Sequence, residues 1–359
     1  MNNILRNPIR RFDVPRPLLC SAPKTATGTT ILPEVSGLRY YPDTRPGIRR
    51  RRCGRGFTYV APDGTLIRKG KERRRIEKLA VPPAYEDVWI SPVANGHLLA
   101  TGYDARQRKQ YMYHPRWAAT RAETKFASLV EFGAALPSIR LKVRRDLARK
   151  AGEREFALAA AVALIDRLSL RAGSPVYARE NDTYGALTLQ RRHLRFENGK
   201  LRVSFRSKGG KRVRRQLGDR TLLRALEKIS DLPGAELLSW LDDNGEAHSL
   251  GSAALNAYIA EAGGSDQFSA KTFRTWSGTV AAFGAVCDRE HPTVKAMAEA
   301  AARRLHNTPA IARKSYIHPG VINLAENKRR LPRPARQAGL DLTERRLLAF
   351  LRAEQVGRS

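Results

Sequence analysis

Five side chains that lie far apart in the sequence could together transfer a phosphoryl group. They are Arg171 in Leu-Arg-Ala-Gly, Lys208 in Ser-Lys-Gly-Gly-Lys, Arg274 in Lys-Thr-Phe-Arg-Thr-Trp, Asn307 in His-Asn-Thr-Pro and Tyr316 in Arg-Lys-Ser-Tyr. A tyrosine hydroxyl can attack a phosphate, and fixed cations stabilise the charge that builds up during the attack. Guanidinium groups beside a tyrosine also favour its phenolate form. The set predicts phosphoryl transfer in which side-chain cations do the work of a metal ion.

The charge of the chain indicates a polyanionic partner. The 359 residues include 66 lysines and arginines against 34 aspartates and glutamates, a formal net charge of +32 at pH 7. Such an excess favours nucleic acid or an anionic membrane surface. A membrane span needs about 20 apolar residues, but the longest apolar stretch, 156–165, ends at Asp166. The N-terminus also lacks the apolar segment of a secretory signal, so we expect a cytoplasmic protein that does not span a membrane.

The sequence shows no metal or nucleotide motif. Its three cysteines, Cys20, Cys53 and Cys287, are odd in number and far apart, which is atypical of a disulfide framework or a zinc cluster. The histidines lack metal-binding spacing, and no Walker-type phosphate loop occurs. We therefore expect no metal, no nucleotide and no other cofactor.

Composition and patterning divide the N-terminal third into two parts. Residues 1–55 are rich in proline and end in the run Arg49–Arg52, which predicts a basic, largely disordered arm. Residues 56–117 contain short extended segments separated by turn residues, typical of a small, mainly antiparallel β domain. Within it, Phe57–Ala61 and Thr65–Arg68 flank the turn Pro62-Asp63-Gly64 and predict a hairpin.

The remainder of the chain has mainly helical patterns. Apolar periodicity predicts helices over 123–136, 139–151 and 153–171. Tight turns between the segments 193–196, 201–205 and 212–217 predict a three-stranded β meander. We assign 118–326 to a mainly α catalytic domain, and 327–359 to a linker with an appended helix at 343–354. The overall prediction is an α+β protein.

Six stretches, in order along the chain, resemble the poxvirus-like and bacterial type IB DNA topoisomerases. The stretches are 46–52 (PGIRRRR), 79–89, 100–117 (ATGYDARQRKQYMYHPRW), 183–189 (TYGALTL), 270–276 (AKTFRTW) and 307–319 (NTPAIARKSYIHP). The resemblance covers about residues 37 to 325, and six stretches in order are far more specific than any one alone. It implies the catalytic fold shared by tyrosine recombinases and type IB topoisomerases.

The resemblance gives each of the five side chains a role. It implies that Tyr316 attacks a DNA phosphate to form a 3′-phosphotyrosyl bond, while Arg171 and Arg274 bind the nonbridging oxygens. Lys208 would be the general acid for the departing 5′ oxygen, and Asn307 a neutral donor where poxvirus members carry histidine. The implied activity is relaxation of supercoiled duplex DNA without ATP or metal. The family expectation is a monomer clamped around DNA, here on the bacterial nucleoid.

Further residues match DNA-contacting positions of the family. A strand over 108–113 places Gln110 on one face and Tyr111 and Tyr113 on the other. Glutamine can bond adenine bidentately, and tyrosine can reach a phosphate or a thymine methyl group. The resemblance extends this contact role to Arg108, Lys109, Tyr177 and Lys271. Ordinary strand packing of the two tyrosines is the alternative.

Two positions depart from the family pattern. Gln107 and His306 stand where relatives commonly carry glycine. We expect Gln107 to stiffen the loop before the DNA-facing strand. The imidazole of His306 would either change the orientation of Asn307 or point to solvent.

Two other functions are open at this point. Tyrosine recombinases share the Arg, Lys, Arg, Tyr chemistry, but they usually carry histidine where this chain has Lys271, and their N-terminal module is helical. A noncatalytic DNA-compacting or RNA-binding protein would explain the charge but not the motifs.

Overall fold

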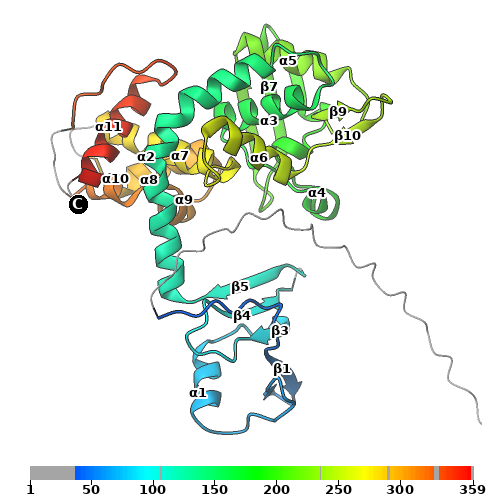
Figure 1. Cartoon of the computed structure of the whole chain (residues 1–359), viewed down its shortest axis with the longest axis vertical. Coiled ribbons are helices and arrows are strands. Elements are labelled where there is room, and N and C mark those ends of the chain that lie inside the picture. Colours follow the sequence, from blue (N-terminus) through cyan, green and yellow to red (C-terminus); the bar gives the residue numbers. More distant parts are fainter. Residues whose placement is uncertain (1–36, 106, 235, 289–291, 327–330, 357–359) are drawn as a thin grey trace, which may run out of the picture. The chain divides into compact units, whose positions relative to one another are not determined.

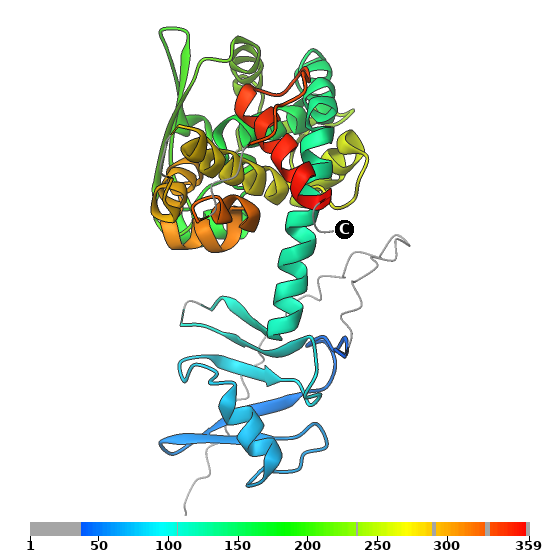
Figure 2. The same cartoon turned by 90° about the vertical axis from the view of Figure 1, so that its left-hand side faces the viewer.

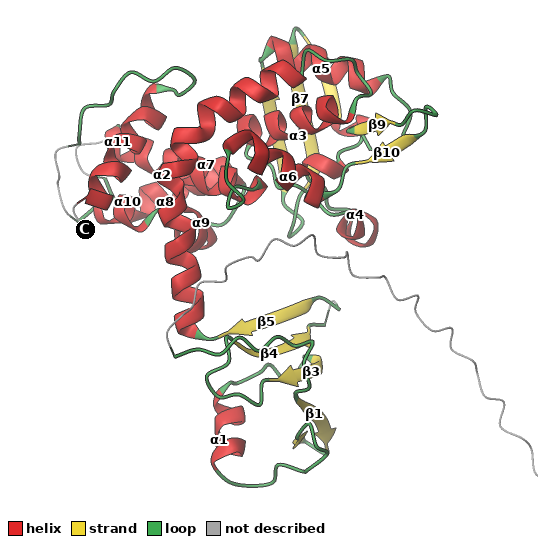
Figure 3. Cartoon of the chain, viewed as in Figure 1, coloured by secondary structure: helices red, strands yellow, loops and turns green. Residues whose placement is uncertain are grey.

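The computed structural model describes residues 37–105, 107–234, 236–288, 292–326 and 331–356 (Figure 1). The chain forms two compact units, with the boundary between Thr120 and Arg121. Strands dominate the first unit and helices the second (Figure 3). The predicted α+β class is therefore confirmed, and the predicted domain boundary at residue 117 lies close to the division between the units.

The first unit is built on a five-stranded antiparallel sheet in the order β2-β1-β3-β4-β5. Its elements are β1 (Ile48–Cys53), β2 (Gly56–Val60), α1 (Lys71–Lys78), β3 (Glu86–Ile90), β4 (Leu98–Tyr103) and β5 (Lys109–Tyr113). Its apolar core is a cluster of Ile48, Tyr59, Ile76, Val88, Ile90 and Ala100. The ladder partner of β2 is β1. The predicted hairpin partner of β2, the segment 65–68, is joined to it by one isolated bridge, Val60–Leu66.

Strand β1 corrects the predicted extent of the N-terminal arm. The run Arg49–Arg52 lies in this strand, so assigning 48–55 to a disordered arm was wrong; residues 1–36 lie outside the described residues. Ile48 is buried, and Arg50 donates to three backbone carbonyls of the segment 81–85. The Arg50 guanidinium also lies 4.1 Å from the centroid of the Phe57 ring. Charge alone would place the Arg50 side chain in solvent, but these contacts hold it against the sheet.

The second unit is mainly helical around a small sheet, and α2 (Pro115–Asp146) leads into it from the first unit. The helices that follow are α3 (Arg154–Leu168), α4 (Pro175–Asn181), α5 (Arg220–Ser230), α6 (Ser252–Gly263), α7 (Ala270–Cys287), α8 (Val294–Leu305), α9 (Pro309–Tyr316), α10 (Pro319–Asn323) and α11 (Leu342–Val356). Among the described residues, no helix combines the length and apolar character needed to cross a bilayer.

A single helix replaces the two that the sequence predicts over 123–151. α2 continues through Pro137 to Asp146. A proline inside a helix removes one backbone hydrogen bond and costs about 3 kcal/mol. Buried side chains on both sides of the proline, Leu136 and Ile139 among them, extend one apolar stripe into the core. Packing of this stripe offsets the local cost and keeps the helix continuous.

Helix α3 is central to the second unit, because nearly all of its side chains are buried. An α-helix that is apolar all round is an internal one, and α3 contacts α5, α6 and α7. The predicted meander is present as β6 (Leu194–Glu197), β7 (Lys200–Arg206) and β8 (Arg212–Leu217), in that order. Asn198 and Gly199 both have positive φ, 51° and 67°, as a tight hairpin turn requires. Two short strands, β9 (Ser239–Leu241) and β10 (Ala247–Ser249), form a second hairpin.

The C-terminal helix α11 is part of the core of the second unit and is not a loose addition to it. Figures 1 and 2 show α11, in red, alongside α2. Its residue Glu344 is 6% exposed and accepts hydrogen bonds from Arg140 of α2 and from the indole of Trp276 on α7. Arg140 also pairs with Asp166 of α3. One carboxylate on α11 therefore ties together α2 and α7, and through Arg140 also α3.

Replacement of Glu344 by alanine should destabilise the protein by about 3–5 kcal/mol, because it leaves a buried guanidinium short of a partner. Urea denaturation of the full chain measures this loss. Glu227→Ala is the matched control, since Glu227 is an exposed carboxylate on α5, and its loss should change stability little. Similar values for the two variants would show that α11 is not fixed by this contact.

Candidate active site

Four of the five predicted site residues come together around α7. Arg274 lies on α7, and Tyr316 is the last residue of α9. Arg171 follows the end of α3, and Asn307 lies between α8 and α9. Because α7 packs against α3, α8 and α9, residues as distant in sequence as Arg171 and Asn307 are in direct contact.

Arg274 is the most buried of the four, with 4% of its surface exposed. It donates to the carbonyl oxygens of Ser169 and, at 3.0 Å, Leu305, and its Cζ lies 5.3 Å from the centroid of the Tyr316 ring. Burial, followed by the charge of Arg171, lowers the pKa of Arg274 to about 10, so it stays cationic at neutral pH. Its Nε is buried and has no hydrogen-bond partner among the described residues.

Arg171 orients the amide of Asn307. Nη2 of Arg171 lies 2.5 Å from Oδ1 of Asn307. Since a guanidinium only donates, the oxygen of Asn307 must face Arg171 and its NH₂ group must point elsewhere. This Nδ2 is also buried and has no partner among the described residues. Burial lowers the pKa of Arg171.

The backbone of Tyr316 is fixed by close packing of α9 on α7. Its carbonyl accepts from the Thr279 hydroxyl at 3.1 Å, and the same hydroxyl accepts from His318 N at 3.2 Å. Gly278 allows this approach, since a Cβ there would lie 2.7 Å from the Tyr316 carbonyl oxygen. The side chain of Tyr316 is half-buried beside Arg274.

Lys208 stands apart from these contacts. It is exposed in the turn between β7 and β8, which is closed by a 2.8 Å hydrogen bond from Ser207 N to the Lys211 carbonyl. Gly209 and Gly210 follow it with φ of 81° and 75°. The turn is tied to the site through Ser207, whose hydroxyl accepts from Arg171 at 3.1 Å.

Two residues near the site have environments that the sequence pattern did not reveal. Lys125 of α2 lies with its Nζ 5.5 Å from the Tyr316 ring centroid, although a lysine on a helix is usually solvated. His306 has a left-handed backbone with φ of 51°, and its Nε2 is buried without a partner among the described residues. No motif marks Lys125. The sequence signal that pointed to His306 was its position next to Asn307 in the chain.

Comparison with known proteins agrees with this geometry. Residues 114–312, more than half of the chain, match the family model of the eukaryotic DNA topoisomerase I catalytic core. Residues 56–104 match that of the bacterial DNA topoisomerase IB N-terminal domain. The chain belongs to the type IB DNA topoisomerase family.

Two relatives illustrate the range of similarity within the family. DNA topoisomerase 1B of Acanthamoeba polyphaga mimivirus is 27% identical over 296 residues, which cover 78% of this chain and 88% of the relative. DNA topoisomerase 1B of Vaccinia virus (strain Copenhagen) is 22% identical over 121 residues, 34% of this chain and 38% of the relative. The enzyme is thus an isomerase of DNA, and the comparisons favour neither a recombinase nor a passive nucleic-acid-binding protein.

The topoisomerase presents two exposed tyrosines on β5, the edge strand of its first unit. The rings of Tyr111 and Tyr113 are stacked with centroids 6.0 Å apart, and the two residues are 49% and 45% exposed. Strand alternation places Gln110 on the other face, where its amide donates to Asp104 at 3.0 Å.

Acidic partners hold Lys109, the first residue of β5, and Arg108, which precedes it. Arg108 pairs with Asp104, and Lys109 pairs with Asp43 at 2.5 Å, a contact that raises the pKa of Lys109. Gln107 has the left-handed φ of 55° that glycine would adopt more easily, and its amide donates to a nearby glutamate. In the second unit, Tyr177 on α4 is 41% exposed, and Lys271 is exposed on the first turn of α7.

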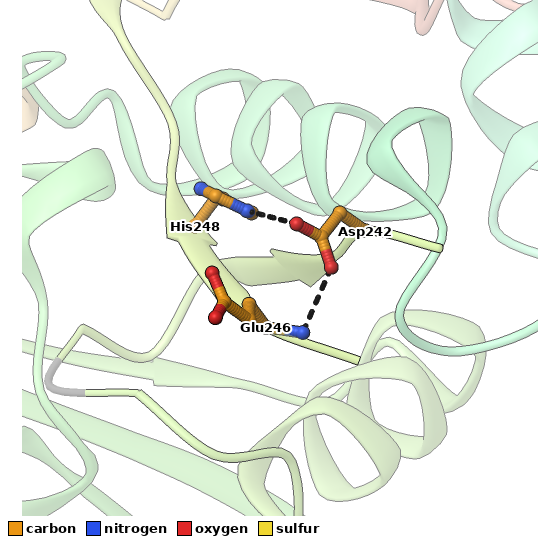
Figure 4. Close-up of side chains that lie close together, drawn as sticks. All are labelled: Asp242, Glu246 and His248. Carbon is orange, nitrogen blue, oxygen red and sulfur yellow. Dashed lines mark hydrogen bonds and ion pairs between the residues drawn. The ribbon is translucent and has the colours of Figure 1, made fainter. Parts of the chain in front are cut away.

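The described residues contain one group of side chains with the spacing of metal ligands, Asp242, Glu246 and His248 on the β9–β10 hairpin (Figure 4). Both Asp242 oxygens and the Nε2 atom of His248 already have partners. One oxygen of Asp242 accepts from Nε2 of His248 at 2.8 Å, and the other accepts from backbone N–H groups, including that of Glu246 at 2.9 Å. We interpret the group as a turn-stabilising network. Cys53 and Cys287 are free thiols, and Cys20 lies outside the described residues.

His306 should make the protein acid-sensitive. Burial and then the charge of Arg215 lower its pKa from 6.5 to about 4, so between these values the unfolded chain binds a proton that the folded chain does not. Stability from this residue is present above pH 6.5 and is lost as the pH falls toward 4. His306→Asn keeps a side chain that tolerates a left-handed backbone. As the pH is lowered through this range, the melting temperature should therefore fall less steeply in the variant than in the wild type. Parallel melting-temperature profiles for the two proteins would contradict the assignment.

Proposed function

We propose that the enzyme relaxes DNA through covalent attack by Tyr316. The Tyr316 oxygen forms a bond to phosphorus while the bond from phosphorus to the 5′ oxygen breaks, which leaves a 3′-phosphotyrosyl strand and a 5′ hydroxyl. The phenol loses its proton to solvent, and the 5′ oxygen takes one from Lys208. Rotation of the free strand is followed by the reverse step. Because the phosphodiester energy is kept in the protein–DNA bond, no ATP is consumed.

The observation that best supports this proposal is a pair of unsatisfied buried donors, one on Arg274 beside the Tyr316 ring and one on Asn307, which contacts Arg171. Arg274 Nε and Asn307 Nδ2 have no hydrogen-bond partner in the described protein, and buried donors in folded proteins are nearly always bonded. A phosphate oxygen would satisfy both kinds of donor. The match to the catalytic-core family ends at residue 312, so the assignment of Tyr316 rests on its position and not on that match.

The arginines suit a pentacoordinate phosphorus centre. Arg171 is half-buried and Arg274 is buried, and both donate hydrogen bonds to neutral oxygens. Neither forms an ion pair with a carboxylate among the described residues. Their charge is available to stabilise the nonbridging oxygens. In other phosphoryl-transfer enzymes a metal ion has this role. Asn307 adds a neutral donor, which is worth about 10²–10³ in rate when well placed.

Lys208 suits the role of general acid because its side chain is long, exposed and not held by the other described site residues. Its long side chain extends from a two-glycine turn into solvent, while Ser207 ties the base of that turn to Arg171. A lysine placed in this way can approach the 5′ oxygen once DNA is bound. Free in the turn, it need not contact the other site residues beforehand.

We further propose that the enzyme acts as a monomer closed around duplex DNA, in the cytoplasm and on the nucleoid. The first unit, which includes β1, would form the clamp, and the second unit, which includes α11, would form the catalytic domain. The basic residues before position 37 would raise nonspecific affinity. The net charge of +32 and the exposed pair Tyr111 and Tyr113 support the DNA contact.

Tyr316→Phe should bind duplex DNA with nearly unchanged affinity and form no covalent adduct, because only the nucleophilic oxygen is lost. Denaturing gels of labelled duplex measure the adduct, and a mobility-shift assay measures binding. Wild-type relaxation of supercoiled plasmid should persist in EDTA without ATP. An adduct with the variant, or a strict magnesium requirement in the wild type, would overturn the mechanism.

A duplex with sulfur in place of the bridging 5′ oxygen separates the acid from the other cations. A thiolate leaves without protonation, so Lys208→Ala should cleave this strand at close to the wild-type rate. Arg171→Ala and Arg274→Ala should stay slow on the same strand, since charge still builds on the nonbridging oxygens. Rapid-quench cleavage assays measure the rates. Rescue of all three variants, or of none, would remove Lys208 from the role of acid.

A further inference from the structure

Lys125 of α2 makes a set of contacts that the mechanism above does not use. Its Nζ donates to the carbonyl oxygen of Ser315, the residue before Tyr316. The same Nζ lies 4.3 Å from the ring centroid of Phe126 and 5.5 Å from that of Tyr316. Lys125, Ser315 and Tyr316 all belong to the second unit, so these contacts lie within one compact body.

The charge of Lys125 opposes folding. The ion pairs found among the described residues give it no acidic partner, and burial followed by the charge of Lys271 lowers its pKa from 10.5 to about 8. As the pH falls from 10.5 to 8, the unfolded chain gains a proton that the folded chain does not, so stability decreases. Below pH 8 the folded protein carries this cation at a net cost. A residue that destabilises the folded protein and also lies beside a proposed nucleophile is a candidate for a functional role.

We propose that Lys125 is a positioning residue for Tyr316, which it holds by its hydrogen bond to the Ser315 carbonyl and by the cation it places at the phenol ring. This inference rests on the proposed role of Tyr316 as nucleophile. Lys125 does not replace any of the five side chains already assigned.

The geometry gives Lys125 two effects on the nucleophile. Consecutive carbonyls of α9 are anchored from different helices, that of Ser315 by Lys125 of α2 and that of Tyr316 by Thr279 of α7. Such double anchoring limits the movement of the phenol, and small misplacements of a reacting group are costly in rate. The Lys125 ammonium also joins Arg274 as a second cation near the ring, so that positive charge lies beside the nucleophile where the phosphate must approach.

The second effect depends on pH. Among the described residues, the charge of Lys271 on α7 acts on Lys125, and the Tyr316 ring of α9 lies beside it. Arg274 of α7 lies near the same ring. Arg274 stays cationic up to about pH 10, so it does not change near pH 8. The cation of Lys125 is present below about pH 8 and is lost above it. The advantage that Lys125 gives to cleavage should follow the same course.

The test compares Lys125→Met with the wild type in single-turnover cleavage of duplex DNA across this pH range. Methionine keeps the length and apolar stem but removes the charge and the donor. We expect cleavage to slow roughly 10- to 100-fold at neutral pH, with duplex affinity nearly unchanged. The ratio of wild-type to variant rate should fall as the pH rises through about 8. Taking the ratio cancels the pH dependence of the reaction itself.

Controls separate this role from a structural one and from loss of charge in general. Lys125→Met should be at least as resistant to thermal unfolding as the wild type, because it removes a half-buried cation. Lys125→Arg keeps a cation at all these pH values and should recover part of the rate. Lys228→Met removes an exposed lysine of α5 and should leave cleavage unchanged.

Three results would overturn the inference: a wild-type cleavage rate in Lys125→Met, a rate ratio that does not vary with pH, or a less stable Lys125→Met protein. Tyr316→Phe, assayed in parallel, distinguishes this failure from failure of the proposed function. If that variant still forms an adduct, the nucleophile itself is misassigned. If it forms none while Lys125→Met cleaves normally, Lys125 alone is misassigned.

Discussion

The second unit depends on keeping the Arg274 guanidinium buried and charged, with no carboxylate partner among the described residues. A buried cation is costly unless its donors are satisfied. Two helix C-termini supply the acceptors: Ser169 caps α3 and Leu305 ends α8, and both carbonyls accept from Arg274. Carbonyls at a helix C-terminus carry the negative end of the helix dipole. The cation is therefore stabilised by neutral groups and keeps its full charge for an anion.

Other arginines around the site also donate to carbonyls at helix C-termini. Arg215 donates to the carbonyls of Arg303 and Arg304 in the last turn of α8, and Arg304 donates to the carbonyl of Arg167 in the last turn of α3. Carboxylates are the acceptors elsewhere in the second unit, as in the pairing of Arg140 with Asp166 and Glu344. Among the described residues, the arginines beside Tyr316 therefore have no carboxylate partner, and a carboxylate there would compete with any anion that they bind.

The sequence predicted the secondary structure well where one local signal dominated. Tight turns and alternating apolar residues identified the meander, and periodicity identified α3. The prediction failed where tertiary contacts outweighed the local signal. Consecutive arginines at 49–52 are typical of a solvated arm, but carbonyls of the segment 81–85 accept from Arg50 and draw the run into a sheet. Pro137 is typical of a helix end, but the buried stripe of α2 continues past it.

The chemistry of the candidate site was determined by the sequence, because residue type and motif order do not depend on coordinates. Tyr316, the two arginines and Asn307 could be named before their contacts were known. Only the tertiary structure decided how they are held: which atoms of Asn307 and Arg274 are unsatisfied, and that Lys208 stands apart in its turn. The structure alone also brought Lys125 to Tyr316, across 191 positions in sequence. Burial and dipole orientation arise from packing between distant segments, and no local pattern encodes them.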